Sequence, residues 1–172
     1  GRLSRLFRGA FMGRVPTDQL TLLNAVVAQL VDQLSLNAET CFISDDPVPE
    51  YWPGDPTITV TTVDVTFPEG FLAGGGVNTA AEYTGIAVNV FTRNMLDEAG
   101  HAQQITATLL TLKLQVLKAL TMFDPTNDDG NNILRNLMAP ERSVRIQATE
   151  NNDGRAHFFS LVFTTDFDWD LS

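Results

Sequence analysis

The segment TTDFDWDLS, residues 164–172, is where side-chain spacing comes closest to a chemical site. Asp166, Asp168 and Asp170 are two residues apart, and carboxylates are ligands that Mg²⁺ takes in proteins. In a strand, residues two apart share one face but lie roughly 6–7 Å apart, so three in a row do not converge on one ion. The opposite face should be buried, since it carries Phe159, Leu161, Phe163, Phe167 and Trp169. We predict that the aspartates form the solvated or interface face of a strand and hold no metal.

Two loop motifs also fail as sites. In DPTNDDGNN, residues 124–132, placing Gly130 sixth in a calcium loop puts Asn136 twelfth, where a bidentate Glu is required. We therefore predict a turn that ends a helix. The GGG at 74–76 lacks the Lys-Ser/Thr of a phosphate loop.

Histidine and cysteine give no stronger signal. Glu98 and His101 have the helical spacing of a di-iron ligand pair, but Gly100 interrupts it and the sequence holds no second copy. Cys41 is the one cysteine, and no flanking motif marks it as the partner of His101 or His157. We predict a protein that is not an enzyme and has no cofactor.

Composition and charge describe an acidic globular domain. The chain has 172 residues, of which 44% are hydrophobic and 19% charged, and no apolar run reaches the roughly 18 residues of a membrane helix. Its net charge is −10, yet Arg2, Arg5, Arg8 and Arg14 all precede the first acid, Asp18. The residues after Arg14 therefore carry 7 − 21 = −14. A domain with this much negative charge should repel nucleic acid.

Residues 1–15 form a separate basic element. At helical spacing the arginines fall on one side and apolar residues such as Phe7 and Phe11 on the other, while Gly9 and Gly13 weaken the helix. We predict an amphipathic arm that docks on an acidic surface of its own or a neighbouring subunit. A membrane-surface role and an uninvolved terminus are the alternatives.

From residue 16 onward the pattern predicts helix, two strands, helix, two strands. The first helix should have Thr17 as N-cap and Asp18 in its first turn. The expected elements in the first half are a Pro-rich loop at 44–56, a strand with a bulge or a face change at 57–67, a projecting loop or loose hairpin at 68–83 and a strand at 84–93. In the second half they are a helix at 99–122, a short element at 133–138, a strand at 142–149, a hairpin turn at 150–154 and a strand at 156–170. This order predicts an α+β fold, with two main helices packed on one face of a mostly antiparallel or mixed sheet. We expect a single domain over 16–172 after the arm at 1–15.

The periodicity also predicts the core. The first helix should bury one row at spacings of 3 and 4: Leu20, Leu23, Val27, Leu30 and Leu34. In the second helix the row is Ile105, Leu109, Leu112, Val116 and Leu120, and Leu110, Leu114 and Leu117 widen it. We expect both rows to pack on the sheet face where Leu161 and Phe163 lie beside Val88 and Val90.

The order and residue composition of these segments resemble those of a known protein family. The segments are LTLLNAVVAQLVDQL, a Pro-rich loop with two strands, VFTR before a long helix, APERSVR, and an NDG hairpin before a strand ending FDWDL. Together they are similar to the tail terminator (tail completion) proteins of long-tailed bacteriophages. The likeness covers about residues 17–171, includes no catalytic motif and leaves the arm outside.

The resemblance implies a non-enzymatic virion assembly protein of the phage tail or neck, assembled in the host cytoplasm. Its subunits would form a hexameric ring that caps the tail tube and binds a tail tube protein and a head-side neck protein. DNA would pass through the lumen without specific binding, and no membrane would be involved. The alternatives are another head-tail connector or neck protein, or a small α+β enzyme or ligand-binding protein with an unrecognised site.

Interfaces of such a ring should come from segments that the core does not use. These are the arm, the Pro-rich loop and the loop at 68–83. Aromatic and Arg residues are enriched at interface centres. The candidate anchors are Arg2, Arg5, Phe7, Arg8, Phe11, Tyr51, Trp52 and Phe71.

Overall fold

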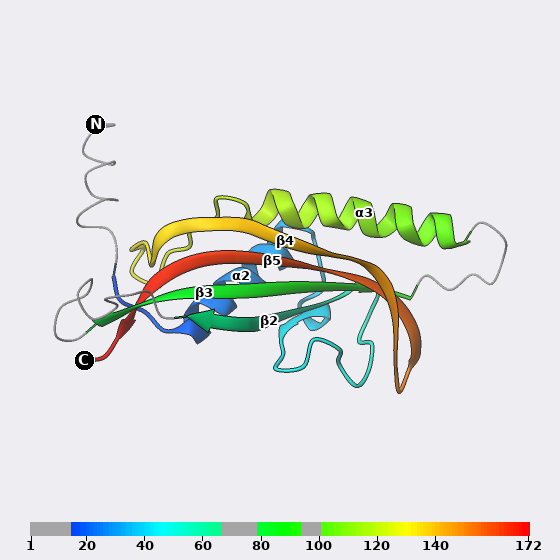
Figure 1. The fold of residues 1–172 in the computed structure, drawn as a ribbon, viewed down its shortest axis with the longest axis horizontal. Coiled ribbons are helices and arrows are strands. Elements are labelled where there is room, and N and C mark those ends of the chain that lie inside the picture. The colour runs from blue at the N-terminus through cyan, green and yellow to red at the C-terminus, as the bar shows by residue number, and fades with distance from the viewer. Residues whose placement is uncertain (1–14, 67–78, 94–100) are drawn as a thin grey trace.

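The computed structural model describes residues 15–66, 79–93 and 101–172, and in them five strands form one sheet with two helices on one face (Figure 1). The elements are α2 (Gln19–Gln33), the 3-10 turn η2 (Ala38–Thr40), β1 (Cys41–Ile43), β2 (Thr57–Thr66), β3 (Thr79–Thr92), α3 (His101–Leu120), β4 (Leu134–Asn151) and β5 (Gly154–Asp170). The strand order is β1-β2-β3-β5-β4. The protein is therefore an α+β fold, as predicted. The predicted arm at 1–15 lies outside the described residues, except for Val15.

The sheet is mixed, because β1 runs parallel to β2 while all other neighbours are antiparallel. Strand β2 is rich in Thr, Val and Ile, which favour strands because their branched side chains pack well on a pleated surface. Its pairing with β3 stays in register through Val63 and shifts between Val63 and Thr66. A bulge in this strand is confirmed, but it follows the step from Val60 to Val63 at which the apolar phase of the sequence slips.

The core lies between the helices and the sheet face that carries Ile86, Val88 and Val90. Val88 pairs with Leu161, and Phe163 pairs with Ile86 on the same face, as predicted. The predicted row of α3 is confirmed in its main members: Ile105, Leu109, Val116 and Leu120 are buried, and Leu112 packs against them.

The predicted row of α2 is confirmed at Leu23, Val27, Leu30 and Leu34, which are buried or packed against the core. It is wrong at Leu20, which is 61% exposed, and the helix buries Leu22 and Val26 in addition. The apolar residues of this helix cover a wide arc, with Leu20 and Leu22 at its two ends. Spacing alone could not decide which end of the arc would meet the sheet.

The N-cap of α2 is Asp18, not Thr17, because the Asp18 side chain accepts a hydrogen bond from the Thr21 N–H at 2.7 Å. Thr17 is buried and pairs with Trp169 in a parallel bridge. Its N–H donates to the Asp168 carbonyl at 2.7 Å, and its carbonyl accepts from the Asp170 N–H at 3.0 Å. The chain before α2 therefore extends the sheet beside the end of β5.

Two strands are longer than predicted. Strand β3 begins at Thr79, inside the range expected to be a projecting loop, and residues 67–78 lie outside the described chain. Strand β4 joins the predicted short element at 133–138 and the predicted strand at 142–149 into one strand. Its four register shifts against β5 break the alternation that would have indicated a single strand. The hairpin turn before Gly154, whose φ is 106°, is confirmed.

Candidate interaction surfaces

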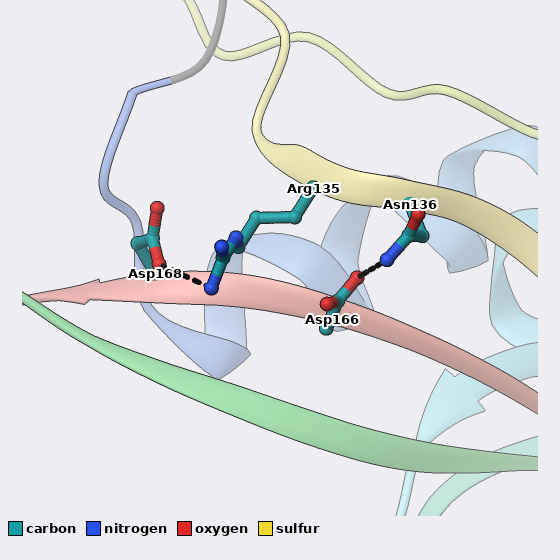
Figure 2. Close-up of polar contacts among 4 residues, drawn as sticks. All are labelled: Arg135, Asn136, Asp166 and Asp168. Atoms are coloured by element: carbon teal, nitrogen blue, oxygen red, sulfur yellow. Dashed lines mark hydrogen bonds and ion pairs between the residues drawn. The ribbon is translucent and has the colours of Figure 1, made fainter. Parts of the chain in front are cut away.

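The row of aspartates on β5 is fixed by neighbouring residues on β4 (Figure 2). Asp166 Oδ1 accepts a hydrogen bond from Asn136 Nδ2 at 2.7 Å, and Asp168 Oδ1 lies 3.7 Å from Arg135 Nη1. The opposite face of the strand is buried, as predicted, since Phe159, Leu161, Phe163 and Phe167 are core residues. The face with the aspartates is only partly exposed to solvent, because the carboxylates of Asp166 and Asp168 contact residues of β4.

The third carboxylate, Asp170, is at the exposed end of the strand. Hydrogen bonds from the hydroxyl and the backbone N–H of Ser172 lower its pKa. Across the described ranges 15–66, 79–93 and 101–172, no group of three or more His, Cys, Asp or Glu side chains is placed to hold a metal ion. The aspartates thus act as separate polar contacts in this fold.

Burial shifts the pKa values of Cys41 and His157 in the direction that favours the neutral form of each side chain. Cys41 is buried beneath α2, and desolvation raises the pKa of its thiol to about 12. Desolvation, with the nearby charge of Arg155, lowers the pKa of His157. A thiolate nucleophile at Cys41 is therefore disfavoured near neutral pH.

Glu82 is a buried carboxylate on the helix-facing side of β3, beside Phe167. Burial raises the pKa of Glu82, and a hydrogen bond from the Trp169 side chain opposes that rise. Its Oε2 atom has no hydrogen-bond partner among the described residues. Such a group destabilises the fold when it is ionised, because burial penalises the charged form.

The Pro-rich loop is part of the fold. Trp52 packs in a small apolar cluster with Phe91, Phe158, Ala156 and Val48, on the sheet face opposite the helices. The indole Nε1–H donates to the Gly154 carbonyl at 3.1 Å, and the Trp52 N–H donates to Asp153 Oδ2 at 2.9 Å. The loop therefore holds the β4–β5 hairpin against the second face of the sheet.

A buried polar network on that same face was not predicted. Asn89 lies in the middle of β3, and its Nδ2 donates to the hydroxyls of Thr59 and Thr61 at 3.1 and 3.2 Å. Its Oδ1 accepts from the Ser160 hydroxyl, and the Thr59 hydroxyl donates to the Pro47 carbonyl at 2.8 Å. The one signal in the sequence is an Asn within the apolar run VNVF. The network ties three strands and the Pro-rich loop together.

The structure separates the predicted interface residues into three groups. Tyr51 is 58% exposed and is available for contact, whereas Trp52 is 5% exposed and packs within its own subunit. The expectation that the core leaves Trp52 unused is wrong, because the hairpin supplies it with a partner. The remaining candidates lie outside the described residues: Arg2, Arg5, Phe7, Arg8, Phe11 and Phe71.

The structure also exposes apolar residues that were not chosen as anchors. Leu110 and Leu114 on α3 are 52% and 53% exposed. Both were predicted to widen the buried row of this helix, and that prediction is wrong for Leu110 and Leu114, whereas Leu117 packs against the core. In the described part of the chain, neither helix has the length and apolar character needed to cross a membrane.

Comparison with known proteins gives distant likenesses only. No family model matches the chain, and no curated protein matches it. Among solved structures, a chain from the virion of a native gene transfer agent particle is similar, at 17% identity and a TM-score of 0.44. That match covers 86% of this chain and 95% of the other. A second solved structure has 15% identity and a TM-score of 0.41, and covers 87% of this chain and 96% of the other.

Proposed function

We propose that the protein is a non-enzymatic virion assembly protein: a ring subunit that caps a phage tail tube and joins it to the head-side neck. In this proposal six copies form the ring, and DNA passes through its hole. The partners are a tail tube protein on one side and a neck protein on the other. The protein would be assembled in the host cytoplasm and end in the virion.

The element order is the observation that carries the proposal. Helix α2, the Pro-rich loop, strands β2 and β3, helix α3 and the β4–β5 hairpin follow each other as the family resemblance implies. The hairpin turn and the strand ending FDWDL lie at the positions that carry that resemblance. The observed order of elements therefore supports the proposal.

The charge of the chain is compatible with this role. Six copies of a chain of net charge −10 carry −60. An acidic channel lets DNA slide because it offers the phosphates no cations to bind. The same charge argues against a protein that holds DNA.

The mass of the assembled protein tests the proposal directly. Size-exclusion chromatography with light scattering should give a mass near six times the 18.9 kDa of the chain, and electron microscopy should show rings with a central hole. Purified protein added to tails that lack it should then restore their joining to heads. A protein that stays monomeric at all concentrations, or rings that never join tails, would overturn the proposal.

A further inference from the structure

One edge of the fold is uniformly acidic. Residues 15–46, which include α2, η2 and β1, contain five acids and no base. We call four of these acids, whose side chains are exposed, the acidic edge: Asp32, Glu39, Asp45 and Asp46. Asp18 is not included, because it follows Thr17 beside the end of β5. With no cation among them, they have no compensating charge within their own segment.

The opposite edge is basic, although the chain as a whole is acidic. Helix α3 contains Lys113 and Lys118 and no acid over 20 residues. Strand β4 adds three arginines and two glutamates, so α3 and β4 together carry 5 − 2 = +3. We call this surface the basic edge; its exposed cations are Lys118, Arg142 and Arg145.

The basic edge also presents apolar side chains to solvent. Leu110 and Leu114 are one helical turn apart on α3, and Ala107 is exposed in the turn before them. The buried row of α3 already fills the space above the sheet, so these leucines are not needed by the core. Single exposed leucines are common, but a row of them beside a basic strand indicates a contact surface.

Strands β1 and β4 lie at opposite ends of the sheet, although α2 and α3 contact each other between them. Helix α2 packs over β1 and β2, whereas α3 packs over β3, β5 and β4. Figure 1 shows α3 running along β4, with β2 on the other side of β3. A second copy of the chain, however, offers the missing acidic partner.

We propose that the basic edge of one subunit binds the acidic edge of the next, with Leu110 and Leu114 at the centre of the contact. This assignment deepens the proposed ring and rests on it. A contact between two different surfaces of the same chain repeats head to tail and closes into a ring when the rotation between copies allows it. Complementary charge fixes which surfaces meet, and the leucines supply the apolar area.

The contact is made by side chains more than by strand addition. Strand β4 contains Pro140, which has no N–H to donate, and Glu141, Arg142 and Arg145 surround it. Charges, proline and register shifts at an exposed edge disfavour open-ended pairing with another strand. The outer surface of α3 therefore forms the centre of the interface.

A charge-swap experiment tests this assignment. The variants Lys118→Glu/Arg142→Glu and Asp45→Lys/Asp46→Lys should each fall from the assembled mass toward 18.9 kDa. Mixing the two variants should restore assembly, because each then meets an edge of opposite charge in an alternating ring. Arg155→Glu, at the hairpin and outside both edges, is the matched control and should assemble like the wild type.

Each outcome separates this interface from the ring itself. A monomeric wild type would overturn both proposals, whereas wild-type rings that tolerate both charge reversals would overturn only this interface. Loss of assembly without rescue on mixing would also overturn it, provided that both variants melt like the wild type. If either charge variant melts below the wild type, the variant Leu110→Ser/Leu114→Ser is used in its place. Intact assembly of this leucine variant would overturn the interface, and loss of assembly would support it. Binding of a short DNA duplex through Lys118 and Arg142 by intact rings would assign the basic edge to nucleic acid instead.

Discussion

The indole ring of Trp52 lies against the ring of Phe91, with the ring centroids 5.0 Å apart. One residue belongs to the Pro-rich loop and the other to a central strand, and Phe91 in turn stacks on Phe158 at 5.0 Å. This contact gives the second face of the sheet a small apolar core of its own. The Pro-rich loop is thus a structural element whose removal should be measurable.

Replacing Trp52 with Ala should destabilise the fold by about 3–5 kcal/mol, because a large buried ring leaves a cavity. Tyr51→Ala is the matched control; its side chain is exposed, so its effect should stay within about 0.5 kcal/mol. Urea unfolding of both variants measures the difference. Equal effects at the two neighbouring positions would mean that the Trp52 cluster is absent in solution.

Neighbouring leucines on α3 should respond in opposite ways to truncation. Leu109 is fully buried in the core, so Leu109→Ala should cost about 2–5 kcal/mol of unfolding free energy. Leu110 points to solvent, and Leu110→Ala should change the stability of the isolated subunit by no more than about 0.5 kcal/mol. Denaturant unfolding at low protein concentration tests this pair. A larger loss at Leu110 would show that α3 is rotated from the orientation described.

Glu82 should make the protein less stable as the pH rises. Burial raises its pKa above the ordinary value near 4.5, so the protonated form is favoured in the fold. Its contribution to stability is fully present below pH 4.5 and is lost as the pH rises through the raised pKa. Glu82→Gln removes this titration and should therefore melt above the wild type at pH 7, with a smaller gap at pH 4. A difference in melting temperature between Glu82→Gln and the wild type that does not change with pH would rule out the titration of Glu82 as its cause.

Cys41 should be inert toward thiol reagents in the native protein. Its thiol is buried and has a pKa of about 12, so almost none is thiolate at pH 8, and thiolate is the reactive form. Ellman's reagent should react with one thiol per chain only after denaturant is added. Fast reaction in native buffer would place Cys41 at the surface and would reopen a nucleophilic role.

The sequence predicts those features of the fold that depend on local spacing. The row Leu109, Val116 and Leu120 has one helical interpretation, and the structure confirms it. Spacing fails at one end of the apolar arc of α2, where Leu20 and Leu22 point in nearly opposite directions and only packing against the sheet selects Leu22. It fails again in β4, where register shifts remove the alternation.

Individual hydrogen bonds and ion pairs between distant residues could not be predicted. The hydrogen bonds from Trp52 to the hairpin join residues about a hundred positions apart, and the pair Arg135–Asp168 depends on the register between β4 and β5. The interface surfaces have the same character, because exposure and opposite placement on a sheet are properties of the assembled fold. The sequence still indicated the sign of the charge on the acidic surface, since residues 15–46 contain acids and no base.

The last prediction concerns where the basic arm ends and the folded domain begins. The sequence predicts an arm over residues 1–15, but Val15 packs against the core and its N–H donates to the Asn132 carbonyl at 3.0 Å. A deletion that spares these contacts therefore ends at Arg14. Deleting residues 1–14 should leave the melting temperature unchanged, and raise the negative charge of each chain from −10 to −14.

Extending the deletion through Thr17 should instead destabilise the domain, because three backbone hydrogen bonds are then lost: Val15 to Asn132, Thr17 to Asp168, and Asp170 to Thr17. At about 1 kcal/mol each, the loss is roughly 3 kcal/mol, and the melting temperature should fall by about 6–12 °C.

The shorter deletion should weaken binding to acidic neighbours, and raised salt should have the same effect on the full-length protein, because ions screen exposed charges. Thermal melting and assembly onto tails distinguish the two deletions. Normal joining by the protein lacking residues 1–14 would reduce the arm to a passive terminus, and an unchanged melt without residues 1–17 would contradict the pairing of Thr17 with β5.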